Sequence, residues 1–171
     1  LMEALKDENE NYAVGAAMFL ANRQAKQAVP AIVALGERLM PRVKENPRHG
    51  ILQNIIVALG MLGDNRGANF LWKLVRENWN DEVPYPMAES TIALAKMKDP
   101  GIAAEIMNRI NRQLNMFFII ALQNLKDSRA NSYLMNFLSN KMEDPEHFGT
   151  FIQTCKLFGY TKDRSTYNFL K

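Results

Sequence analysis

Residues 58–75 have the sequence ALGMLGDNRGANFLWKLV, which predicts the end of one helix, a tight turn and the start of a second helix. Before the turn, the apolar residues continue a stripe with helical spacing. Gly63 is suited to end that helix, and the Asp64 carboxylate can accept a hydrogen bond from a free backbone N–H at the start of the next helix. A second apolar stripe follows over residues 70–75. The stretch therefore predicts a helical hairpin.

Copies of this turn recur along the chain. Aspartate stands at the same point in three of them, each preceded by an Ala-Leu pair and followed by a paired apolar step: Asp64, Asp99 and Asp127. Two degraded copies are centred on Ala25 and Lys162. Repetition at intervals of tens of residues is typical of solenoid architectures, in which the terminal repeats are often atypical.

We therefore predict an all-α fold, a right-handed α-solenoid (α-α superhelix) of about five stacked helical hairpins. Stacking is expected because one hairpin cannot bury both of its apolar stripes alone. We expect a single repeat domain over residues 1–171 that is a piece of a longer chain. The hairpins are expected at approximately 8–42, 46–78, 85–112, 114–141 and 145–171.

Prolines and apolar runs give more local expectations. In the first hairpin we expect helices over about 11–21 and 28–39, with an irregular or 3₁₀ first turn before Pro30. Pro84 and Pro86 are expected to keep helix out of the polar loop at 79–86. The run MFFIIAL at 116–122 is apolar nearly all round, and we expect it to form the most buried helix.

Two aromatic residues of the 79–86 segment leave two interpretations open. Trp79 and Tyr85 could form an exposed binding ridge, or they could cover the ends of neighbouring helices. The second interpretation is the one we favour at this point.

Composition sets only broad limits. The 171 residues are 47% hydrophobic and 23% charged with a net charge of +3, which is ordinary for a soluble protein. One cysteine excludes an intramolecular disulfide and leaves the compartment open, with a slight preference for the cytoplasm. No apolar run is long enough to cross a membrane.

The pattern resembles HEAT-like repeats, and most closely the short HEAT repeats of the phycobilisome-lyase class. The resemblance rests on ALGMLGD at 58–64 and AVPAIVAL at 28–35, supported by the Ala-Leu…Asp series at 93–99 and 121–127. It implies an armadillo-like α-solenoid whose second helices line the concave face. Proteins similar in this way include scaffolds, inhibitor-binding subunits, bilin lyases and some DNA glycosylases, so the resemblance is specific for architecture rather than function.

Catalytic and metal-binding patterns are absent from the sequence. His49 and His147 have no ligand partners at helical spacing, and Cys155 has no positioned histidine. There is no phosphate loop and no nucleophile elbow. We therefore expect no enzyme activity, no metal and no cofactor.

Charge is unevenly distributed among the predicted helices. After the first hairpin, the second helices with their turns carry ten basic and three acidic residues, not counting the three turn aspartates, together with several asparagines. A basic face of this kind suits an acidic protein segment or a nucleic-acid backbone, whereas a plain solvated face is the structural alternative. The candidate concave binding face consists of Arg66, Asn69, Lys73, Arg76, Asn108, Arg109, Arg112, Arg129, Asn136, Lys141 and Arg164. Asp64, Asp99 and Asp127 are expected to be structural turn caps.

These observations predict a non-catalytic repeat scaffold that binds another protein, or another domain of its own chain, through that face. An acidic partner would fit its charge. Binding of nucleic acid or another polyanion through the basic second helices is the alternative, and a bilin-lyase-type HEAT protein is the third possibility.

Overall fold

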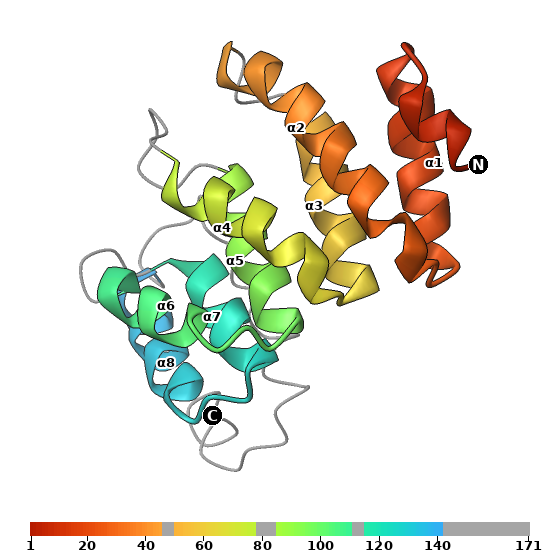
Figure 1. Ribbon diagram of the computed structural model, residues 1–171. Coiled ribbons are helices and arrows are strands. Elements are labelled where there is room, and N and C mark those ends of the chain that lie inside the picture. Colours follow the sequence, from red (N-terminus) through yellow and green to blue (C-terminus); the bar gives the residue numbers. More distant parts are fainter. Residues whose placement is uncertain (46–49, 78–84, 111–114, 142–171) are drawn as a thin grey trace.

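The computed structural model describes residues 1–45, 50–77, 85–110 and 115–141, and in these ranges the chain is all-helical (Figure 1). Its eight α-helices form four consecutive hairpins, which confirms the all-α prediction. The pairs are α1 (Glu10–Asn22) with α2 (Val29–Glu45), α3 (Ile51–Leu62) with α4 (Ala68–Arg76), α5 (Tyr85–Lys96) with α6 (Ile102–Ile110), and α7 (Met116–Asn124) with α8 (Arg129–Lys141). Short 3₁₀ helices precede three of the α-helices: η1 (Glu3–Lys6), η2 (Lys26–Ala28) and η3 (Asn65–Gly67). The fifth predicted hairpin lies outside the described residues, as do Trp79, His49, His147 and Cys155.

The first helix of every hairpin ends in the same backbone geometry. One residue in each turn adopts a left-handed conformation with φ between 55° and 59°: Gln24, Gly63, Lys98 and Lys126. The next residue is the predicted repeat anchor, and in three turns its N–H donates to the carbonyl five residues earlier, as from Asp99 to Leu94 at 3.1 Å. This is the Schellman pattern of helix ends. The anchors chosen from the sequence therefore occupy equivalent positions in the four described turns.

The first helices pack directly on one another, α1 on α3, α3 on α5 and α5 on α7. Each of α2, α4 and α6 packs on the first helix of the following hairpin, and successive second helices have no extensive contact with each other in the described part of the chain. In Figure 1, α2 and α4 lie in front of α3 and α5. Small residues allow the close approach of the first helices, since a Cβ added at Gly60 would lie 3.1 Å from the Cβ of Ala93. Because each inner first helix contacts both first and second helices, it needs apolar side chains on several sides, which explains why the first helices are so apolar.

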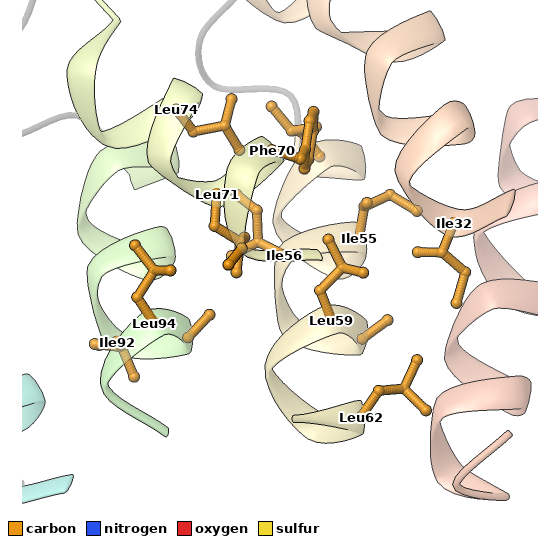
Figure 2. Close-up of a cluster of buried hydrophobic side chains, with 14 of the residues drawn as sticks. Ile32, Ile55, Ile56, Leu59, Leu62, Phe70, Leu71, Leu74, Ile92 and Leu94 are labelled. Atoms are coloured by element: carbon orange, nitrogen blue, oxygen red, sulfur yellow. The ribbon is translucent and has the colours of Figure 1, made fainter. Parts of the chain in front are cut away.

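The core is continuous from α1 to α8 among the described residues. Figure 2 shows side chains of four helices converging around α3: Ile32, Ile55, Ile56, Leu59, Leu62, Phe70, Leu71, Leu74, Ile92 and Leu94. Burying one such Leu or Ile contributes about 2 kcal/mol to stability. The Phe70 ring reaches under α2, where a Cβ added at Gly36 would lie 2.6 Å from its Cζ. Phe70 thereby links α4 to the first hairpin.

Two predictions about prolines need correction, while one is confirmed. As expected, a 3₁₀ turn leads into an α-helix that begins beside Pro30. That helix was expected to end near residue 39, but it runs through Pro41 to Glu45. Pro41 deprives the Glu37 carbonyl of its helical donor, and both residues are exposed, so water can replace that bond.

Pro86 also fails to keep helix out, because α5 begins at Tyr85. Pro86 lies in the first turn, where its missing N–H has no helical acceptor to lose.

The prediction that the run at 116–122 forms the most buried helix is wrong. The run is helical, but Met116, Phe117 and Ile120 are only half-buried, whereas α5 is buried at every position from Ser90 to Ala95. α5 has first helices on both sides and second helices over it. In the described part of the chain, α7 has a first-helix neighbour on one side only.

None of the helices in the described ranges combines the length and apolar character needed to span a bilayer.

Candidate functional site

The three turn aspartates share one local geometry. Each carboxylate accepts a hydrogen bond from the backbone N–H two residues later, at 3.0 Å for Asp64, 2.9 Å for Asp99 and 3.0 Å for Asp127. These contacts satisfy N–H groups that the start of the next helix leaves without partners. The three carboxylates therefore hold the turns together.

Two of these turns also hold an arginine. The Arg66 guanidinium donates to both Asp64 oxygens at 2.9 and 2.7 Å, and Arg129 contacts Asp127 in the same way at 2.9 and 2.6 Å. These hydrogen bonds lower the pKa of the Asp64 and Asp127 carboxyls below their ordinary value. Arg66 also donates to the Lys26 carbonyl at 2.9 Å, which joins the first two turns.

The Asp99 turn differs because Gly101 stands at the arginine position. Here the indole N–H of Trp72 donates to the second Asp99 oxygen at 3.2 Å. The Arg76 guanidinium lies over the Trp72 ring, 4.6 Å from its centroid. A Cβ at residue 101 would lie 3.2 Å from the Trp72 ring, so the small residue leaves room for the indole.

Two further cations of the predicted face connect neighbouring hairpins. Lys73 on α4 pairs with Glu37 on α2 at 2.6 Å. The Nε of Arg109 donates to Glu105 at 2.6 Å, and one Nη donates to the Val75 carbonyl at 3.2 Å. Its other Nη lies 2.9 Å from the Met87 sulfur. Arg109 is partly buried and thus ties α6 to α4 and α5.

The predicted face is therefore largely engaged in internal contacts. Arg66, Lys73, Arg109 and Arg129 each pair with a carboxylate. Asn69, Asn108 and Asn136 are exposed on three different second helices. Arg76 stacks on Trp72. The other three members fall outside what the structure describes: Arg112, Arg164 and the side chain of Lys141.

A groove of about 350 Å³ lies between α2 and α4. It is lined by Glu37, Met40, Pro41 and Lys73, and the Glu37–Lys73 ion pair lies across it. Within the described ranges, no group of three His, Cys, Asp or Glu side chains is placed to hold a metal ion.

The most exposed large apolar side chains lie on first helices rather than second helices. Beyond Leu1 and Met2, the described chain exposes Tyr12 (61%), Phe19 (45%) and Tyr85 (62%). Tyr12 and Phe19 lie two turns apart on α1, and exposed Gly15 lies between them with open space where its Cβ would be. We call Tyr12, Gly15 and Phe19 the α1 patch. The Arg23 guanidinium lies 5.3 Å from the centre of the Phe19 ring.

The repeat alignment would have pointed to this patch. Phe19 stands six residues before its turn anchor, where the later hairpins have Ala58, Ala93 and Ala121. Those alanines are buried, and Ala93 lies against the preceding first helix at Gly60. A large aromatic residue at a position of small buried residues was the available signal.

Tyr85 forms a second, smaller aromatic site. Its ring meets that of Phe117 edge to face, with centroids 6.0 Å apart, at the beginnings of α5 and α7. Tyr85 remains 62% exposed, so it does not serve as a buried cover for helix ends. This exposure favours the binding-ridge interpretation for this residue.

Comparisons with protein-family models, with curated proteins and with solved structures found no match to this chain.

Proposed function

We propose that this chain is a non-catalytic helical-repeat module that binds another protein, or another domain of its own chain, through the α1 patch. The observation that carries the proposal is the exposure of Tyr12 and Phe19 on one face of α1. Exposed aromatic side chains are enriched among the residues that dominate protein–protein binding energy. The proposal includes the finer architecture, a right-handed α-solenoid of HEAT-like hairpins.

The shape of the α1 patch supports a protein ligand. Tyr12 and Phe19 form two projections, and Gly15 leaves a gap between them that a partner side chain can enter. Aromatic projections beside such a gap give a partner both apolar area and a defined position. The phenol of Tyr12 adds a hydrogen-bonding group at the rim.

Binding through the second helices has weaker support than it had from sequence alone. Among the candidate cations whose side chains the structure describes, only Arg76 forms no salt bridge with a described carboxylate, and it stacks on Trp72. A nucleic-acid ligand would have to displace the existing ion pairs. A tetrapyrrole would need an apolar pocket, whereas the groove between α2 and α4 is lined by the charged pair Glu37 and Lys73.

The test is a selection of peptides from a displayed random library on the immobilised protein. Selected peptides would then be titrated against the wild type and against Tyr12→Ser. We expect Tyr12→Ser to weaken binding about tenfold, the usual order for loss of an aromatic anchor.

Tyr85→Ser is the matched control, because it removes the same side chain at similar exposure from a different helix. Binding that is lost in Tyr12→Ser and kept in Tyr85→Ser supports the α1 patch. Selected peptides that bind both variants as tightly as the wild type would overturn it, as would a selection that enriches nothing.

A further inference from the structure

The four described turns follow one another along one edge of the molecule (Figure 1). We call this edge, residues 22–29, 61–68, 95–102 and 123–130, the turn edge. Two hydrogen bonds join its first two turns, from Gln24 to the Met61 carbonyl at 3.1 Å and from Arg66 to the Lys26 carbonyl. The turn edge is therefore one continuous surface feature, at least over these hairpins.

Charge is concentrated on the turn edge. These residues include seven cationic side chains and three carboxylates, a net charge of +4 that exceeds the +3 of the whole chain. All three carboxylates are already engaged, two by arginines and Asp99 by Trp72. Five exposed cations form no salt bridge within the described ranges: Arg23, Lys26, Lys96, Lys98 and Lys126.

Apolar side chains lie between these cations. Phe19 is exposed close to the first turn, and Met61, Met97 and Leu125 are half-buried at the ends of α3, α5 and α7. Each turn thus offers an apolar side chain, and three of the four also offer a free cation. Neighbouring packed helices lie about 9 Å apart, so the first and fourth turns are separated by about 27 Å.

We propose that the turn edge docks an acidic peptide segment of the partner in which pairs of acidic residues alternate with pairs of apolar residues. Each face of such a segment, when extended, carries both carboxylates and apolar side chains. The proposal rests on the proposed protein-binding function and names the partner's chemistry. An extended segment of about eight residues spans 27 Å. Its carboxylates can pair with the free cations while its apolar residues cover the half-buried side chains.

A nucleic-acid backbone fits this edge less well. Phosphates present charge at every nucleotide, whereas the second turn has no free cation, because Arg66 is held by Asp64. The half-buried Met61 and Met97 would face solvated phosphates rather than apolar groups.

The left-handed turn residues allow charge to be removed from the turn edge without straining the backbone. Lys98 and Lys126 have φ of 57° and 59°, so glycine fits both positions without strain. The double variant Lys98→Gly/Lys126→Gly removes two cations and is expected to fold at least as stably as the wild type. Lys6→Gln/Arg42→Gln is the control, because it also removes two exposed cations, but from positions outside the turn edge.

The measurement is fluorescence anisotropy of three labelled probes on the full chain at low salt. The probes are a peptide of about twelve residues with a repeated Glu-Glu-Leu-Leu sequence (the Glu/Leu peptide), a matched Glu/Ser peptide with Ser in place of Leu, and a mixed-sequence DNA duplex. We expect the Glu/Leu peptide to bind most tightly. The double glycine variant should weaken it about fivefold, as loss of two exposed ion pairs implies, and Lys6→Gln/Arg42→Gln should leave it unchanged.

Equal binding of both peptides, preference for the duplex, or no effect of the double glycine variant would each overturn the proposal. Should the Glu/Leu peptide fail to bind while library-selected peptides still depend on Tyr12, the turn-edge inference falls and the proposed function stands. Should neither kind of peptide bind, both fall.

Discussion

The first and second helices of the hairpins differ in where their side chains find partners. First helices pack on each other through small and apolar residues, as Gly60 does on Ala93, and yet they expose Tyr12, Phe19 and Tyr85. Second helices carry most of the cations picked out from the sequence, but four of these cations are bound to carboxylates. Charge on a helix is therefore a poor guide to a binding face when a matching carboxylate lies within reach.

The largest effect is expected from a substitution that disrupts the packing between first helices. Gly60→Leu places a large side chain against Ala93, and we expect it to lower the free energy of unfolding by about 3 kcal/mol or more. Gly15→Ala is the matched control, since its new Cβ meets nothing and removes a helix-destabilising glycine. It should raise stability by about 0.5 to 1 kcal/mol. Urea denaturation of both variants measures this, and a tolerated Gly60→Leu would contradict the close approach of α3 and α5.

A smaller loss of stability is expected when cations of the second-helix face are removed, and its size should differ between Arg109 and Arg129. Arg109→Met removes the hydrogen bond to the Val75 carbonyl and the pair with Glu105, and should cost about 1.5 kcal/mol. Arg129→Met removes a pair within one turn, with half of the arginine side chain exposed, and should cost less. Thermal melts of the two variants decide the point. If Arg129→Met proves the more destabilising, Arg109 is not the residue that ties α6 to its neighbours.

The smallest expected effect is a pH dependence of stability that comes from the two turns in which an arginine pairs with the aspartate. The folded pKa of Asp64 and of Asp127 lies below the ordinary value of 3.8. Their contribution to stability is therefore full above that pH and is lost as the pH falls below it. Unfolding in urea at pH 5 and at pH 2.5 should show this loss in the wild type and a smaller loss in Asp64→Asn/Asp127→Asn. Identical losses would mean that the arginine pairs do not stabilise these turns.

Sequence reasoning located the repeats well because turn chemistry is local. In three hairpins, an aspartate caps the N–H two residues later and an apolar pair begins seven residues after it. The anchors at Ala25, Asp64, Asp99 and Asp127 each follow a residue in the left-handed conformation. It failed where it ended the second helix near residue 39 and where it excluded helix at Pro86. The exposure of Pro41 and the position of Pro86 in the first turn remove the cost of each proline.

The binding face was harder to predict, because ion pairing between helices depends on tertiary distances. Lys73 and Glu37 are 36 residues apart, and no local pattern joins them. The exposure of Phe19 likewise depends on which side of α1 has a packed neighbour.

The most direct test compares one residue from each kind of helix with the same selected peptide. Phe19→Ser removes an exposed aromatic ring from α1, and Arg76→Ser removes from α4 a cation that forms no salt bridge within the described ranges. The account predicts that Phe19→Ser weakens the peptide's Kd about tenfold and that Arg76→Ser leaves it within twofold of the wild type. The reverse pattern, with affinity lost in Arg76→Ser and kept in Phe19→Ser, would contradict it and return the binding site to the second helices.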